Sequence, residues 1–285
     1  MRRAVPIAVL AVLLSLPAAA AAATRDVRPG GLHRAIERAA PGDTLILHSG
    51  RYRGPVVIPE RLKLFGARGE ARPLIDGRCR ARATITVAAN DVRLRRLEVV
   101  GADESGGSLP SEVDFSDLES GGITDSIVRD TCDAEYGINV FRSRRIDVLR
   151  NTAVGFSDAG IYVGGITDTG RGAIVVRGNE SLRNNRGFIL EDSNGGRVRV
   201  VANGFEGNRS RGEGVPTGVF IRNSDGALFK RNDVAGNGRF GVDLDGNSDR
   251  NRFFGNRIFR NPVNVRNRGA GNCGGGNRPD AFPAC

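Results

Sequence analysis

Three carboxylates and one arginine occupy the outward positions of a five-residue pattern that recurs in the second half of the chain. Each copy begins with Gly, and the later copies carry Glu191, Arg222, Asp243 and Asp245 at these positions. If the copies stack about 4.8 Å apart, Glu191 and Asp245 lie on the order of 10 Å apart, with Arg222 between them. Paired carboxylates can move protons in glycoside cleavage, so we predict Glu191, Asp243 and Asp245 as candidate catalytic residues. The alternative is a solvated ladder of ion pairs.

Aromatic residues occupy the same outward positions. Tyr162 and Phe220 stand in one predicted column, and their flat rings could contact sugar rings. The guanidinium of Arg222 could bind a uronate carboxylate through two parallel hydrogen bonds. We therefore predict Tyr162, Phe220 and Arg222 as substrate-binding residues, against the alternative that the two rings are ordinary β-forming side chains.

A repeat carries these positions and determines the expected architecture. Its Gly-apolar-variable-apolar segments begin at Gly137, Gly160, Gly187, Gly218 and Gly241. Two polar turns follow in each repeat, and they are marked by Asn151, Asn179, Asn203, Asn232 and Asn256 in the first turn and by Asp158, Asn184, Asn208, Asn237 and Asn261 in the second. A unit of roughly 23 residues cannot bury a core alone, but stacked copies can. We therefore predict an all-β parallel solenoid in which Asn side chains form ladders at the corners.

The first part of the chain predicts the same architecture in a less regular form. Residues Leu32–Ala40 place apolar side chains at helical spacing, so we expect a helix that caps the open end of the solenoid. Short strands are then expected at Thr44–Leu47, Val56–Ile58, Leu62–Phe65, Pro73–Ile75, Ala83–Val87 and Val92–Val99. From Thr44 to Asn267 this spacing allows roughly nine or ten turns.

Residues 1–23 have the composition of an export signal, with Arg2 and Arg3 before an apolar stretch and a run of small residues. We expect a mature single domain over residues 24–285 that is secreted or periplasmic and has no integral membrane span.

Export decides how the four cysteines are interpreted. They show no CxxC spacing, and an oxidising compartment favours disulfides over a metal site. Three pairings are open, and we favour Cys79 with Cys132 and Cys273 with Cys285. The second pair would close a Gly- and Pro-rich tail at about 268–285.

The composition also limits metal binding. His33 and His48 are the only two His and Met1 the only Met, so we expect no zinc or copper site and no cofactor. The carboxylates of the acidic window from Gly101 to Glu135 could ligate Ca²⁺, although the spaced Asp loop typical of calcium sites is missing.

Charge is segregated along the sequence. The net charge is +10, yet residues 101–136 carry ten acidic residues against Arg129 alone. We expect this window to be a loop insertion that lies against the Arg-rich remainder. Nucleic acid is not an expected partner, because the chain is exported and lacks basic and aromatic platforms.

Two stretches of the sequence carry a family resemblance. They are the opening AIERAAPGDTLILHSGRYRG of Ala35–Gly54 with VVIPERLKLFG of Val56–Gly66, and the Gly and Asn repeats of Gly137–Asn261. Over nearly the whole mature chain they resemble the right-handed parallel β-helix proteins of the pectin-lyase-like superfamily. The opening is similar to exported carbohydrate-binding and sugar-hydrolase type β-helix domains, which also occur in a periplasmic copper-accessory family and in polyuronate epimerases. The resemblance implies a right-handed parallel β-helix.

The resemblance does not specify an activity, because this superfamily includes lyases, hydrolases, epimerases, esterases and adhesins. The chain lacks the Asp-Pro-x-Asp-Pro motif of alginate epimerases and the Gly-His-Gly and Arg-Ile-Lys motifs of polygalacturonases. We therefore predict an exported monomer that binds polysaccharide on a lateral face of the solenoid. The alternative function is a polysaccharide lyase or glycoside hydrolase that acts on an acidic glycan.

Overall fold

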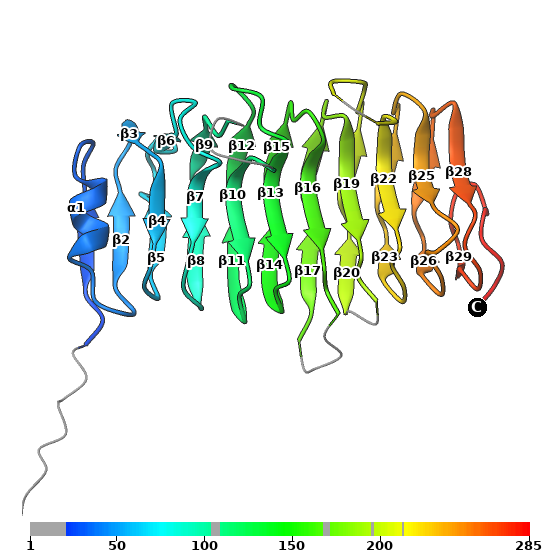
Figure 1. The fold of residues 1–285 in the computed structure, drawn as a ribbon, viewed down its shortest axis with the longest axis horizontal. Coiled ribbons are helices and arrows are strands. Elements are labelled where there is room, and N and C mark those ends of the chain that lie inside the picture. Colours follow the sequence, from blue (N-terminus) through cyan, green and yellow to red (C-terminus); the bar gives the residue numbers. More distant parts are fainter. Residues whose placement is uncertain (1–20, 104–108, 168–171, 195–196, 213) are drawn as a thin grey trace, which may run out of the picture.

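The computed structural model describes residues 21–103, 109–167, 172–194, 197–212 and 214–285. Most of the predicted export signal therefore lies outside the described residues. The described chain coils into an elongated stack of parallel strands, and each of nine successive turns, from β2 to β28, adds one strand to each of three sheets (Figure 1). The predicted all-β parallel β-helix is confirmed.

The three sheets run the length of the stack and have eleven, nine and nine strands. Sheet A contains β1 (Thr24–Val27), β2 (Thr44–Leu47), β5 (Lys63–Gly66), β8 (Val92–Arg95), β11 (Ser120–Thr124), β14 (Arg145–Leu149), β17 (Ile174–Arg177), β20 (Val198–Val201), β23 (Leu228–Lys230), β26 (Arg252–Phe254) and β29 (Cys273–Gly275). Sheet B contains β3 (Arg51–Arg53), β6 (Leu74–Asp76), β9 (Glu98–Val100), β12 (Ile127–Arg129), β15 (Thr152–Val154), β18 (Glu180–Leu182), β21 (Gly204–Glu206), β24 (Asp233–Ala235) and β27 (Arg257–Phe259). Sheet C contains β4 (Val56–Ile58), β7 (Ala83–Val87), β10 (Ser111–Ser116), β13 (Tyr136–Phe141), β16 (Ala159–Gly164), β19 (Arg186–Glu191), β22 (Thr217–Arg222), β25 (Phe240–Leu244) and β28 (Val263–Asn267).

Alternation along the strands builds the core. Val113, Ile138 and Ile161 are paired in register on successive strands of sheet C, and all three are fully buried. On each strand the residues next to these buried positions point outward, because successive side chains of a strand face opposite sides. The core is therefore a continuous column of aliphatic and Phe side chains inside the three sheets.

The Gly that opens each repeat is required by the contact between turns. A Cβ on Gly137 would lie 2.5 Å from the carbonyl oxygen of Gly160, and a Cβ on Gly187 would lie 2.6 Å from that of Gly218. Side-chain carbons do not approach carbonyl oxygens so closely, so the stacking distance itself selects Gly.

The predicted Asn ladder is confirmed at the corner between sheets A and B. Asn179 donates its side-chain amide to the Oδ1 of Asn203 at 2.9 Å, and Asn203 donates to Asn232 at 3.0 Å. The backbone N–H groups of the same residues donate to the same Oδ1 atoms, so each of these Asn residues is bonded twice to the next turn. Buried amides of this kind satisfy corner backbone groups that the sheets leave unpaired.

Both ends of the core are covered. Helix α1 (Leu32–Glu37) places Leu32 and Ile36 against the first turn, and it ends before the predicted Ala40. At the other end, Phe282 stacks on Phe253 with ring centroids 4.1 Å apart. The Cys273–Cys285 disulfide holds this tail in place, as the sequence predicted. No helix in the described part of the chain has the length and apolar character needed to cross a bilayer.

Three expectations about local structure are corrected. The acidic window is no loop insertion over its full length, because β10, β11 and β12 form a regular turn of the solenoid from Ser111 to Arg129. The predicted strand Val92–Val99 is broken at Arg96, whose φ of 57° turns the chain from sheet A to sheet B. In the second ladder, the residue one turn before Asn184 was predicted to be Asp158. It is Phe156, whose N–H donates to the Oδ1 of Asn184.

Candidate functional site

The register of sheet C confirms the first outward column predicted from the repeat, and it confirms the second as far as Arg222, because Asp245 lies just after the end of β25. The first column contains Asn139, Tyr162, Ile189, Phe220 and Asp243 on β13 to β25. The second contains Phe141, Gly164, Glu191 and Arg222 on β13 to β22. Together they form one lateral face, which we call the sheet C face.

Tyr162 lies flat within this face. A Cβ on Gly164 would lie only 2.4 Å from the Tyr162 hydroxyl oxygen, so the ring extends across the Gly of its own strand. Its centroid is 4.6 Å from that of Tyr136, and the two Tyr pack with Ile189 into an outer apolar cluster. Only 8% of Tyr162 is exposed. The predicted open sugar platform at Tyr162 is therefore covered. The rings of Phe141 and Phe220 are half-buried, with the guanidinium groups of Arg142 and Arg186 over them at 4.9 and 5.1 Å from the ring centroids.

Glu191 connects the aromatic cluster to Arg222. The Tyr162 hydroxyl donates to Oε2 of Glu191 at 2.7 Å, and Arg222 forms an ion pair with Oε1. Burial is the main cause that raises the pKa of Tyr162, and its bond to Glu191 adds to the shift. The side chain of Arg222 is 54% exposed while that of Glu191 is 17% exposed, so part of the guanidinium is open to solvent.

The other two predicted carboxylates are held by protein groups. Asp243 is 1% exposed and accepts two hydrogen bonds from Arg266, at 2.7 and 2.5 Å. Asp245 accepts the Ser248 hydroxyl at 2.6 Å and the N–H groups of Asn223 and Asn247, so it closes the turn after β25. The structure thus brings Glu191 and Arg222 into contact but places Asp243 and Asp245 in separate bonding networks.

A cavity of about 570 Å³ opens beside the Tyr136 end of the cluster. Asp158 forms an ion pair with Arg186 in its wall, and Tyr136 also bonds Asp158. Burial raises the pKa of Asp158 above its ordinary value, and the charge of Arg186 opposes this shift. The lining residues are Asp133, Glu135, Ser157, Asp158, Arg186, Gly212 and Gly214.

This cavity was not predicted from the sequence. Asp158 was assigned to a turn, and the predicted columns lay only downstream of each repeat Gly. A column drawn two residues upstream would have placed Glu135 and Asp158 on adjacent turns, where the N–H of Asp158 bonds the carbonyl of Glu135.

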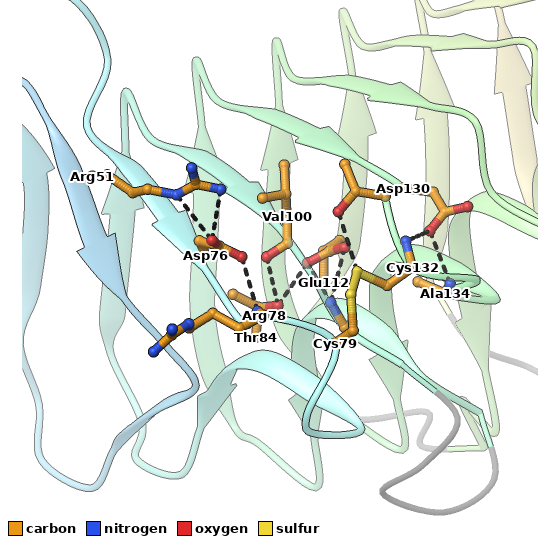
Figure 2. Close-up of a disulfide and its surroundings, with 12 residues drawn as sticks. Arg51, Asp76, Arg78, Cys79, Thr84, Val100, Glu112, Asp130, Cys132 and Ala134 are labelled. Atoms are coloured by element: carbon orange, nitrogen blue, oxygen red, sulfur yellow. Dashed lines mark hydrogen bonds and ion pairs between the residues drawn. A yellow bond between two sulfur atoms is a disulfide. The ribbon is translucent and has the colours of Figure 1, made fainter.

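The Cys79–Cys132 disulfide, the other predicted pair, joins the turn after β6 to the turn after β12. Figure 2 shows Glu112 of β10 beside it, within a network that includes Thr84 and Val100. Glu112 is fully buried, and its carboxylate also faces the N–H of Ala102. Burial raises the pKa of Glu112 to about 8. Thr84, the partner of Glu112 in this network, is fully buried as well.

The side chains that commonly bind transition metals are engaged elsewhere. His48 contacts Glu70 through Nδ1 at 2.8 Å and Asp26 through Nε2 at 3.0 Å, and His33 contacts the carbonyl oxygen of Pro55. Within the described residues no group of three or more His, Cys, Asp or Glu is arranged to hold a metal ion.

Solved structures with the same fold include polysaccharide lyases. A pectate lyase, Pel9A, matches with a TM-score of 0.63 and 14% identity over 92% of this chain and 81% of its own. An alginate lyase from Paenibacillus sp. str. FPU-7 matches with a TM-score of 0.56 and 14% identity over 87% of this chain and 99% of its own. At this identity the likeness establishes the fold alone. No curated protein matches the sequence.

A family model described as periplasmic copper-binding protein (NosD) matches residues 93–277, nearly two thirds of the chain. The donor set of this region does not fit copper. It contains no His and no Met, and its two cysteines, Cys132 and Cys273, are both in disulfides. Copper in proteins is held mainly by imidazole, thiolate and thioether groups, so the matched region shares the family's architecture but contains no imidazole, thioether or free thiol.

The family model covers more than half of the chain, which assigns the chain to this family, and the family assignment indicates the cellular compartment. Proteins of this family are periplasmic, and two disulfides agree with an oxidising, extracytoplasmic environment. The structure adds the β-helix with its Gly and Asn repeats over the same residues. The chain belongs to the NosD family of periplasmic β-helix proteins.

Proposed function

We propose that the protein binds polysaccharide along the sheet C face. The observation that carries the proposal is the outer apolar cluster, where half-buried Phe141 and Phe220 lie over Tyr136, Tyr162 and Ile189. Apolar residues gathered on the outer surface of a solenoid add nothing to its core, and partly exposed apolar clusters rimmed by polar groups mark binding sites.

The surroundings of the cluster match the chemistry of a sugar chain. A sugar ring presents C–H groups on its faces and hydroxyl groups at its edge. The faces would contact Phe141 and Phe220, and the hydroxyls would bond Asp158 and Ser157 in the neighbouring cavity. The cavity volume falls in the range of about 300 to 1,000 Å³ that is usual for small-molecule sites. The open side of Arg222 would bind a carboxylate on the sugar.

A lyase or hydrolase activity has less support. A general acid or base must reach the substrate, yet Asp243 is enclosed with Arg266 and Asp245 closes a turn. Glu191 is the remaining candidate, and its oxygens are engaged by Tyr162 and Arg222. Binding without turnover is therefore the function that the geometry favours.

Tyrosine fluorescence gives a local test of the proposal. The chain has three Tyr and no Trp. Tyr52 is buried in the core, and the other two form the outer cluster. We expect oligogalacturonides to change tyrosine emission saturably, and Phe220→Ala to weaken this response by about tenfold. The matched control is Phe259→Ala, a half-buried Phe on sheet B, which should leave the response unchanged.

Two results would overturn the proposal. An unchanged response in Phe220→Ala, or an equal loss in both Phe variants, would remove the sheet C face as the binding surface. Release of unsaturated or reducing ends that is abolished by Glu191→Gln would replace binding by catalysis. Thermal unfolding of each variant separates these results from a general loss of the fold.

A further inference from the structure

The outward face of sheet A carries one cation on each of four consecutive strands. Arg177 on β17, Arg199 on β20, Lys230 on β23 and Arg252 on β26 are all exposed. These strands lie side by side in the second half of the stack (Figure 1). The cations alternate between two outward rows, because Arg199 is in register with Val175 and not with Arg177.

The positions between the cations are apolar. Val201 is paired with both Arg177 and Lys230, and Leu228 is paired with both Arg199 and Arg252. Val175 and Phe254 complete the pattern at the two ends, and all four apolar side chains are half-buried. Cations and apolar residues therefore alternate in both directions over two rows and four strands. We call these eight residues the basic strip.

The cations of the basic strip lack the carboxylate partners that several outward arginines have elsewhere on the solenoid. On the other two sheets, Arg257 is paired with Asp233 on sheet B and Arg266 with Asp243 on sheet C, each one turn away. Within the described residues, none of the four strip cations lies within ion-pair distance of a carboxylate. The strip thus gathers four exposed cations on adjacent strands without a described carboxylate partner.

This arrangement is unfavourable for the isolated protein. Neighbouring cations on adjacent strands stand about 8 Å apart, which is within one Debye length at physiological ionic strength. Like charges at this distance repel one another. An anionic chain that lies along the strip would replace this repulsion by attraction and release its own counterions.

We propose that the basic strip binds a linear polysaccharide that carries a carboxylate on each sugar, with the polymer lying along the solenoid axis. Same-row cations recur every two strands, at about 10 Å, and the two rows are about 7 Å apart. This is a narrow, straight track suited to one extended polymer. The half-buried side chains between the cations offer apolar contact to the faces of the sugar rings. The site is separate from the sheet C face and does not depend on it.

The geometry favours a glycan over two other polyanions. Peripheral membrane binding requires apolar side chains that enter the lipid interface by about 5 to 10 Å, and those of the strip lie below the cations. Single-stranded nucleic acid is usually held by aromatic rings on which successive bases stack. The strip has one ring, Phe254, and it is half-buried at the edge.

The test measures binding of polygalacturonate and alginate to the full mature protein, with neutral dextran as the uncharged comparison. In the variant Arg199→Glu with Arg252→Glu we expect affinity for both polyuronates to fall by about tenfold or more, and the salt dependence of binding to become shallower. The matched control, Arg34→Glu with Arg53→Glu, makes the same charge change on α1 and sheet B and should retain affinity. The milder variant Arg199→Gln with Arg252→Gln should show an intermediate loss and guards against misfolding.

The outcomes separate the two proposed sites. If the strip variants lose polyuronate affinity and keep the tyrosine response, the polymer binds the basic strip. If they keep polyuronate affinity and only Phe220→Ala weakens the tyrosine response, the polymer binds the sheet C face and the strip proposal fails. Equal loss in the strip and control variants would reduce the effect to net charge and overturn the proposal. Tighter binding to single-stranded DNA of matched charge, or to anionic phospholipid vesicles, would overturn the assignment of a glycan. Unaltered polyuronate affinity in both strip variants would overturn the site.

Discussion

Oγ1 of Thr84 lies 2.7 Å from Oε2 of Glu112, and both side chains are fully buried beside the Cys79–Cys132 disulfide (Figure 2). The same Oγ1 atom lies 3.0 Å from the carbonyl oxygen of Val100. A hydroxyl has one proton for these two acceptors. Both contacts are satisfied when Glu112 is protonated and donates to Thr84, which then donates to Val100.

This relationship predicts a pH dependence of stability. Burial raises the pKa of Glu112 from 4.5 to about 8. The folded state therefore binds the proton more tightly than the unfolded state, so the stabilisation is complete below about pH 4.5 and is lost as the pH rises to about 8. Urea unfolding at pH 5 and pH 8.5 should show the wild type losing a few kcal/mol that the Glu112→Gln variant retains. Glu60→Gln, at an exposed site, serves as the control. An identical pH dependence in wild type and Glu112→Gln would contradict the protonated network.

The Asn ladder predicts a large effect from a single substitution. The side chain of Asn203 donates to Val176 and Asn232 and accepts from the N–H and the side chain of Asn179. Asn203→Ala leaves several buried polar groups unpaired, and each costs about 1 to 3 kcal/mol. Chemical denaturation should therefore show a loss of about 3 kcal/mol or more.

Two further variants test whether the effect of Asn203→Ala comes from its hydrogen bonds. Asn203→Asp keeps the shape but removes the donors, so it should destabilise as well. Asn194→Ala, on an exposed turn, should change stability by less than about 0.5 kcal/mol. If Asn203→Ala were as stable as Asn194→Ala, the ladder would contribute little to stability.

The donor set predicts how the protein responds to copper. The oxidised protein should take up no stoichiometric Cu⁺ from a competing chelator, because its four cysteines are in disulfides and its two histidines are engaged. Reduction should create binding, since thiolates are strong Cu⁺ ligands. A variant with all four cysteines replaced by Ser should bind none in either state. Stoichiometric uptake by the oxidised protein would contradict this prediction.

Much of the fold could be predicted because each turn of the solenoid places the same residue types at the same positions. Gly137 and Gly187 recur at the same place in their turns, so one stacking distance explains them both. The Asn positions follow from the same repetition. Thr44–Leu47, Val56–Ile58 and Ala83–Val87 were predicted with the bounds that the structure shows. The acidic window was predicted to be a loop from its net charge, which does not indicate which side chains are buried. Alternating apolar residues such as Val113 and Phe115 indicated a strand there.

The sequence predicted which residues of the candidate site lie next to one another on adjacent strands, but it did not predict which of their side chains are exposed. The columns of Tyr162 and Glu191 followed from the repeat, yet the ring of Tyr162 is covered because it lies across Gly164 and reaches Glu191. Which rotamer a side chain takes depends on its neighbours from other turns, and the repeat does not record them.

The amino-acid sequence by itself determined the solenoid, its corner ladders and the outward columns, because each of these depends on residue type and period. Only the tertiary structure decided which outward groups are enclosed. Asp243 meets Arg266, Asp158 meets Arg186, and Arg199 meets no described carboxylate. The physical reason is that charge pairing and burial are set by side chains roughly 25 residues apart in the chain but one strand spacing, about 4.8 Å, apart in space.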